Sequence, residues 1–241
     1  MAYGGSFAWF EREESLRQRG LGRLDFLRRF PEGTEGLDEL AALLEIARRE
    51  PSRERLTQGR QLLGRLQQRA PDAEPPVPRL FISHRRADVE PARRVALLAK
   101  QAGFEYWLDV EDPNLGAFGL APSPQGQALV VAAVIEIALI NSSHLLAVIT
   151  RNSFGANPSA WIPYEYGRVK DDTVYCDRTS CWLAGDVAAK PLPEYLHLGH
   201  KHRTETEISA WLDGYSAQCG LPPGRGVAFS DPVLVDTEPL P

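Results

Sequence analysis

Along residues 1–70, apolar side chains recur every three or four positions, most clearly between Leu37 and Ile46. This spacing places them on one face of a helix, and the β-branched residues that favour strands are almost absent from the region. Glycine and proline interrupt the pattern at intervals. The pattern predicts two or three amphipathic helices, the last of them capped by Ser52 and running to about Arg69.

A proline-rich segment at residues 70–78 separates this region from the rest of the chain. Proline lacks the amide donor and clashes with the preceding turn, so the segment cannot continue a helix. Proline and glycine become frequent again near the C-terminus. We therefore expect a helical N-terminal region for docking or oligomerisation (1–74), a folded domain (75–218) and an irregular tail (219–241).

Within the folded domain, short apolar runs of strand length alternate with stretches of helical periodicity. Strands are expected at residues 80–82, 104–108, 145–149 and 173–175, and helices at 89–102, 126–141, from 161 onward and at 205–215. This alternation with short connections predicts an α/β fold, a parallel sheet with helices on both faces. Ligands of such sheets bind at the carboxyl ends of the strands, which draws attention to the segments 83–88, 109–125 and 151–165.

The charge balance restricts the partners of the chain. Its 27 basic and 32 acidic residues give a formal net charge of −5, and the N-terminal arginines are interleaved with acids. Neither nucleic acid nor an anionic membrane is attracted to such a surface, so we expect no direct binding to nucleic acid. A phosphate-bearing ligand would need a local basic pocket instead.

The sequence gives little evidence for a metal site or for secretion of the protein. The 3 cysteines are widely spaced, which suits neither a disulfide framework nor zinc. His197, His200 and His202 lack an obvious acidic or thiol partner, so we expect them to face solvent and expect no metal. The N-terminus lacks the order of a signal peptide. The longest apolar stretch, residues 128–140, is shorter than the roughly 20 residues that span a bilayer. A cytoplasmic protein with no membrane association is expected.

Several segments in succession resemble TIR domains, especially bacterial ones. The resemblance rests on five segments in order: LFISHRRAD (80–88), GFEYWLD (103–109), IEIALINSS (135–143), VITRNSF (148–154) and SAWIPYE (159–165). Each segment is weak alone, but their order and spacing follow the family pattern of strands, helices and a W-x-x-x-E motif. The resemblance implies a flavodoxin-like sheet.

The match is closer to TIR enzymes that cleave NAD than to adaptor domains. In those enzymes the glutamate of W-x-x-x-E is catalytic, which points to Glu165; Pro163 then requires that the helix begin near Trp161. An aromatic residue in a mobile loop covers the substrate, matched here by Phe118. The positions that the resemblance assigns to substrate binding are His84, Arg85, Arg86, Asp109, Gly116, Phe118 and Trp161. It implies NAD as substrate, with no cofactor.

The chemistry agrees with a single carboxylate. The ribose–nicotinamide bond of NAD joins a sugar carbon to a leaving group that is already cationic, so no general acid is needed. The enzyme has to stabilise an oxocarbenium-like transition state and to orient the next nucleophile. Water would give ADP-ribose, and an adenine nitrogen would give a cyclic product. The sequence leaves both open.

Each assignment has a structural alternative. Glu165 could be an acid in a first helical turn, favoured by the helix dipole. Arg85 and Arg86 could be solvated or paired with acids rather than contact phosphate or ribose. Trp161 could pack in the core, and Asp109 could only cap its loop.

Two other functions compete with NAD cleavage. One is a non-catalytic TIR module that assembles with other TIR domains, and the other is a response-regulator receiver. The receiver is disfavoured because Ser83 and His84 stand where its acidic cluster belongs. TIR enzymes are commonly regulated by association, so we expect self-association and suggest that residues 1–74 govern oligomerisation or docking to a separate sensor or effector. A bacterial immune or abortive-infection role follows by analogy.

Overall fold

The computed structural model describes residues 52–68, 78–111, 115, 123–154, 158–168, 177–187, 191–218 and 237–240, together with the helical positions Glu39, Ala42, Leu43 and Ile46. These residues divide into two compact units. The sheet unit contains residues 78–108 and the described residues from 142 onward. The helical unit contains the described residues up to 68 and those between 109 and 141. The described residues between 109 and 141, which lie within the folded domain expected at 75–218, are grouped with α4 (Arg53–Gln67) in the helical unit.

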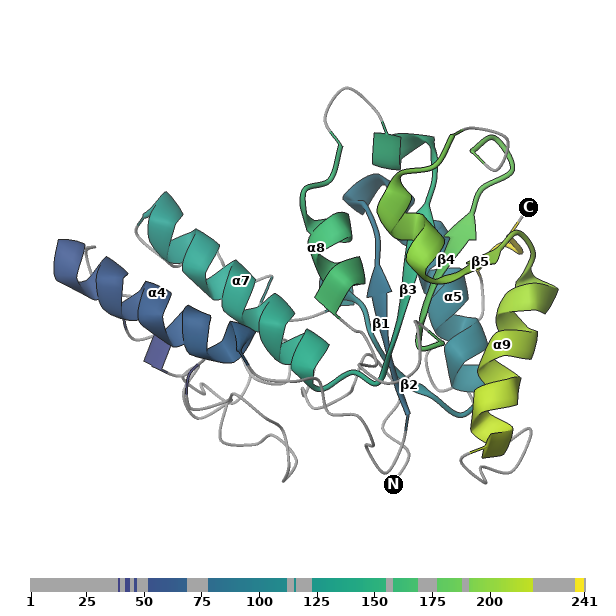
Figure 1. Cartoon of the computed structure of the whole chain (residues 1–241), viewed down its shortest axis with the longest axis horizontal. Coiled ribbons are helices and arrows are strands. Elements are labelled where there is room, and N and C mark those ends of the chain that lie inside the picture. Colours follow the sequence, from purple (N-terminus) through teal and green to yellow (C-terminus); the bar gives the residue numbers. More distant parts are fainter. Residues whose placement is uncertain are drawn as a thin grey trace. The chain divides into compact units, whose positions relative to one another are not determined.

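The sheet unit is built on five strands in the described ranges. They are β1 (Arg79–Ser83), β2 (Glu105–Trp107), β3 (His144–Ile149), β4 (Thr179–Leu183) and β5 (His200–His202). All neighbouring strands are parallel, in the order β2-β1-β3-β4-β5 (Figure 1). The chain adds strands on one side of β1 and then on the other, which is the flavodoxin-like arrangement. The predicted α/β fold is confirmed.

One face of the sheet packs on two neighbouring helices, α5 (Val89–Gln101) and α9 (Glu205–Gln218) (Figure 1). Side chains alternate along a strand, so Leu80 and Ile82 of β1 both point into this core. Helix α5 ends as predicted, because Gly103 has a φ of 86°, a left-handed conformation that suits glycine.

The opposite face of the sheet packs on α8 (Trp161–Arg168), whose Ile162 and Tyr166 are buried. The intervening β1 residues point this way, and Phe81 stacks on Trp107 with ring centroids 4.6 Å apart. The last residue of β1, Ser83, shares the face of Phe81. The predicted covering of both faces by helices is therefore observed within the sheet unit.

Strands β4 and β5 were not predicted from the sequence. The whole of β4 is buried, so it lacks the alternation that marks a half-exposed strand. Strand β5 is three polar residues at the edge of the sheet, and short, charged edge strands are usual because they resist further pairing. The strand that we expected at residues 173–175 lies outside the described residues.

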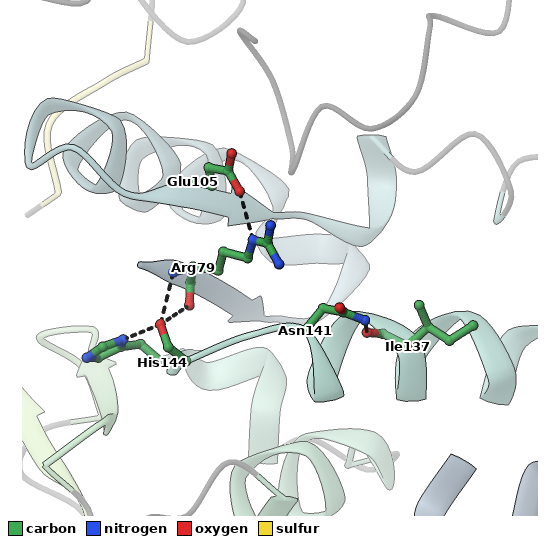
Figure 2. Close-up of polar contacts among 6 residues, drawn as sticks. Arg79, Glu105, Ile137, Asn141 and His144 are labelled. Carbon is green, nitrogen blue, oxygen red and sulfur yellow. Dashed lines mark hydrogen bonds and ion pairs between the residues drawn. The ribbon is translucent and has the colours of Figure 1, made fainter. Parts of the chain in front are cut away.

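The helical unit contains α4 (Arg53–Gln67) and α7 (Pro124–Ile140). The predicted cap of α4 is confirmed, since Ser52 Oγ accepts from the Arg55 amide at 3.2 Å. Helix α7 is followed by its C-cap residue Asn141, whose Nδ2 donates to the Ile137 carbonyl at 2.8 Å (Figure 2). The linker before Pro78 and the expected helices before residue 39 lie outside the description.

Helices α4 and α7 pack closely at Gly59. A Cβ atom on Gly59 would lie 2.7 Å from Leu129 Cδ1, so the leucine side chain would have to shift to accept one. Helix α7 is apolar on all sides, and such a helix is stable only when neighbours cover it. This apolar character explains why segment 109–141 groups with α4. None of the helices that the structure describes combines the length and apolarity needed to cross a bilayer.

Four residues of the C-terminal tail, 237–240, are held against the sheet unit. Arg94 of α5 donates two hydrogen bonds to Glu205 of α9, at 2.6 and 2.9 Å. The same pair binds the tail, because Arg94 donates to the Thr237 carbonyl and Glu205 accepts from the Leu240 amide at 2.7 Å. These tail residues are irregular, as expected, but are tied to both helices.

Candidate active site

Helix α8 carries the W-x-x-x-E motif and begins where the sequence predicts. The Ser159 hydroxyl accepts from the amides of Trp161 at 3.2 Å and Ile162 at 3.3 Å, satisfying donors that have no partner inside the helix. Pro163 is the third residue of the helix, where its missing amide hydrogen is no loss. The helix therefore starts early enough to place Glu165 in its second turn.

The carboxylate of Glu165 points at the carboxyl end of β1 and away from solvent. Ser83 Oγ donates to Glu165 Oε2 at 2.6 Å. Ser83 is 1% exposed and Glu165 6% exposed. A separation of about 2.5–2.7 Å between two oxygens is typical of a hydroxyl bonded to an ionised carboxylate. The site thus holds a buried acid at the edge of the sheet where α/β proteins bind ligands.

The three residues after Ser83 continue around the same edge. His84 and Arg85 are partly buried, and Arg86 is exposed at the start of a 3-10 turn, η1 (Arg86–Asp88). His84 Nδ1 lies 3.4 Å from the Ile82 carbonyl oxygen. His84 is thus one residue along the chain from the Ser83–Glu165 contact, and the arginines follow it.

A second buried carboxylate joins this loop to the loop after β3. Asp88 is 3% exposed, and its Oδ1 accepts from Thr150 Oγ1 at 2.9 Å and from Asn152 Nδ2 at 2.6 Å. The Asp88 amide also donates to the Arg85 carbonyl at 2.7 Å. The loop carrying His84 and the arginines is therefore anchored at its far end to a neighbouring strand end.

The remaining predicted positions are distributed differently. Trp161 is 42% exposed and contacts Tyr164 edge-on, with ring centroids 6.0 Å apart, so it is not a core residue. Asp109 is partly buried in a 3-10 turn, η2 (Asp109–Glu111), which belongs to the helical unit. Gly116 and Phe118 lie outside the described residues. The sheet unit accordingly brings Glu165 to Ser83, and His84 is the next residue along the chain after Ser83.

Ser83 and Asp88 were missed as site residues by the sequence reasoning. Both lie in the segment 83–88 that the strand pattern singled out, so the region was identified but not these side chains. Serine is common at strand ends, and an aspartate before a helix is usually a cap. Asp88 makes no such cap contact here, and its carboxylate bonds across the sheet edge instead. Only the pairing of β1 with β3 reveals that role.

The amino end of the sheet carries a different kind of buried polar group. Ser143 Oγ accepts from the Arg79 amide at 2.9 Å, lies 2.8 Å from His144 Nδ1 and donates to the Arg79 carbonyl at 3.2 Å (Figure 2). Arg79 Nε also donates to Glu105 at 2.8 Å. These contacts join β2, β1 and the start of β3.

His144 is held neutral at this end. It is fully buried against Phe104, Trp211 and Tyr215. Burial, and to a smaller extent the charge of Arg178, lower its pKa to about 3. The contacts of Ser143 suit the tautomer with hydrogen on Nδ1, which leaves Nε2 without hydrogen. Nε2 has no hydrogen-bond partner in the described part of the chain, and this tautomer avoids a buried, unpaired N–H group.

The other histidines and the buried thiol do not form a metal centre in the described ranges. His197 and His200 are exposed, as expected, but His202 is buried. Burial and the charge of His200 lower the pKa of His202 to about 4, against the opposing effect of Glu207. Our expectation of a solvent-facing ring at position 202 was wrong, because β5 turns it toward Trp211. Burial also raises the pKa of the Cys181 thiol to about 12, leaving it unreactive.

Comparisons with known proteins add nothing to this description, since no family model, no curated protein and no solved structure matches the chain.

Proposed function

We propose that this chain is a TIR-type enzyme that cleaves NAD and releases nicotinamide, with Glu165 as the catalytic residue. The observation that carries the proposal is the buried Glu165 carboxylate, bonded to Ser83 at the carboxyl end of the central strand. A buried charge is costly unless it is bonded or used. Its placement at the ligand-binding edge of a flavodoxin-like sheet supports a chemical use.

In this proposal Glu165 stabilises the positive charge that develops on the ribose as nicotinamide leaves. An ionised carboxylate in a desolvated position interacts with such a charge more strongly than it would in water. His84, Arg85 and Arg86 follow the adjacent strand, and the guanidinium groups suit the NAD phosphates. Water as nucleophile yields ADP-ribose, and an adenine nitrogen yields a cyclic isomer.

The experiment is incubation of the purified full chain with NAD at high protein concentration, with chromatographic analysis of the products. We expect nicotinamide together with ADP-ribose or a cyclic isomer. Glu165→Gln keeps the shape of the side chain but removes its charge, and should reduce release by about 1,000-fold, the size of a lost electrostatic contact in a desolvated site. Glu90→Gln is the matched control, because Glu90 is exposed on α5 at the other face of the sheet. Equal release by the wild type and Glu165→Gln would reject the proposal.

A non-catalytic TIR assembly module is the second candidate. It is favoured by the exposure of Trp161, because exposed aromatic residues are enriched at protein interfaces. This alternative predicts self-association, or binding to a sensor protein, that Glu165→Gln does not alter, and no nicotinamide release from the assembled protein. Trp161→Ala would weaken that association. A cytoplasmic role in bacterial immunity belongs to the same proposal, in either form.

A further inference from the structure

We infer that Ser83 is a positioning residue for Glu165, whose hydroxyl keeps the carboxylate ionised and aimed at the sheet edge. The inference rests on the proposed function, because it assigns Ser83 a part in the same reaction. Ser83 contacts no reacting atom in this scheme. It acts through the hydrogen bond that it donates to Glu165 Oε2.

The backbone of Ser83 is held by its strand. Ser83 is the last residue of β1, pairs in register with Ala147 of β3, and lies on the same face as Phe81. Phe81 is in turn fixed by its stack on Trp107. With the backbone held in this way, rotation about Cα–Cβ places the hydroxyl oxygen and rotation about Cβ–Oγ aims its hydrogen, so few degrees of freedom remain.

The partner on α8 is held as firmly. Tyr166, next in sequence to Glu165, is buried on the same helix, and its ring contacts Tyr195 with centroids 5.7 Å apart. The helix start is set by Ser159. Ser83 and Glu165 are therefore presented to each other by two rigid elements, which gives the 2.6 Å contact a fixed geometry.

The direction of the hydrogen bond decides what Ser83 does. An ionised carboxylate can only accept, so Ser83 is the donor to it, and a bond donated to a charged acceptor favours the ionised form of that acceptor. A carboxylate is too weak a base to make serine a nucleophile without a histidine between them. The hydrogen bond therefore orients Glu165 and favours its ionised form, and it does not activate Ser83 as a nucleophile.

The test measures nicotinamide release by the full chain from about pH 3.5 to pH 9 for the wild type, Ser83→Ala and Ser83→Thr, because the ordinary pKa of glutamate is about 4.3. Without the hydroxyl, the acid limb of the kcat profile should move up by about one pH unit, and kcat at neutral pH should fall about tenfold with KM within about twofold. Ser83→Thr keeps the hydroxyl and should restore the limb. Ser180→Ala is the matched control, since Ser180 is equally buried on β4 but donates only to a backbone carbonyl.

An unchanged acid limb in Ser83→Ala, or a change in KM alone, overturns the inference. Should Ser83→Ala not fold, Ser83→Cys, which keeps the size but donates weakly, is judged by the same limb. If the wild type releases no nicotinamide, the proposed function fails on its own. The Ser83 contact is then tested by carbon NMR of labelled glutamate. The Glu165 carboxyl should titrate at higher pH in Ser83→Ala than in the wild type, and equal midpoints would reject the contact's role.

Discussion

The two ends of the parallel sheet treat buried ionisable groups in opposite ways. At the carboxyl end, the acids Glu165 and Asp88 are buried and receive hydrogen bonds from Ser83, Thr150 and Asn152. At the amino end, His144 is buried against aromatic rings, and this burial lowers its pKa and so favours the neutral ring.

This difference suggests that the carboxyl end of the sheet serves the chemical reaction and that the amino end serves the stability of the fold. Donors that surround a carboxylate favour its charge, and a desolvated charge can act on a substrate. Burial away from water favours a neutral imidazole, which contributes packing and little reactivity. The two ends predict opposite outcomes for mutation. Changes at the carboxyl end should affect activity or loop order, and changes at the amino end should affect the response of stability to acid.

The largest effect is expected at Glu165. In addition to the loss of nicotinamide release proposed above, Glu165→Gln should leave the free energy of unfolding within about 1 kcal/mol of the wild type, because the amide retains an oxygen that can accept from Ser83. Urea denaturation at pH 7 measures this. A large loss of stability together with the loss of activity would mean that the carboxylate is structural, and the contrast between the two ends would weaken.

The second largest effect is expected at His144, in the dependence of stability on pH. The folded pKa of His144 is about 3, below the unfolded value of 6.5, so the fold favours the neutral ring. The free energy of unfolding is therefore not reduced by His144 above pH 6.5, and it falls as the pH drops toward 3. The loss due to His144 should reach about 3 kcal/mol at pH 4. His144→Phe should remove this part of the slope while costing about 1 kcal/mol at pH 7 through the lost bond to Ser143.

Urea denaturation at pH 7, 6, 5 and 4 gives the slope of the free energy of unfolding against pH for the wild type and for His144→Phe. His197→Gln is the control for substitution of a histidine, because the ring of His197 is exposed. His202 titrates in the same direction, since its pKa is lowered to about 4, so His144→Phe should retain part of the dependence. A slope identical to that of the wild type would show that His144 opens to solvent before it is protonated.

The third effect is expected at Asp88. Asp88→Ala removes the acceptor of Thr150 and Asn152 and should lower the free energy of unfolding by about 1 kcal/mol, because the half-buried Thr150 and the exposed Asn152 can donate to water instead. Asp88→Asn retains an acceptor oxygen and should lower it less. Denaturation midpoints of the two variants test this order. Equal midpoints for both variants and the wild type would show that the loops are held by other contacts.

The smallest effect is expected at an exposed pair on the same edge. Arg151 donates to Asp186 at 3.0 Å, linking the loops after β3 and β4. Its side chain is 77% exposed, so solvent screens the pair. Arg151→Ala should change the free energy of unfolding by less than about 0.5 kcal/mol, which thermal unfolding can measure. A larger loss would show that this exposed ion pair stabilises the carboxyl edge of the sheet as much as the Asp88 hydrogen bonds do.

Features that depend on neighbouring residues could be predicted from the sequence. Helix α4 begins at its Ser52 cap, α5 ends before Gly103, and Pro163 lies in the first turn of α8. Caps, turns and periodicity act over a few residues, so their effect is written in adjacent positions. The alternation of strands and helices likewise determined the parallel sheet and the edge to inspect.

Only the tertiary structure decided which distant groups meet. Ser83 and Glu165 are 82 residues apart, and their contact depends on how α8 packs against β1. The burial of His202, the link from Asp88 to the loop after β3, and the grouping of segment 109–141 with α4 have the same origin. Each depends on strand order and on which faces become covered, and these are properties of the packed chain that no local pattern contains.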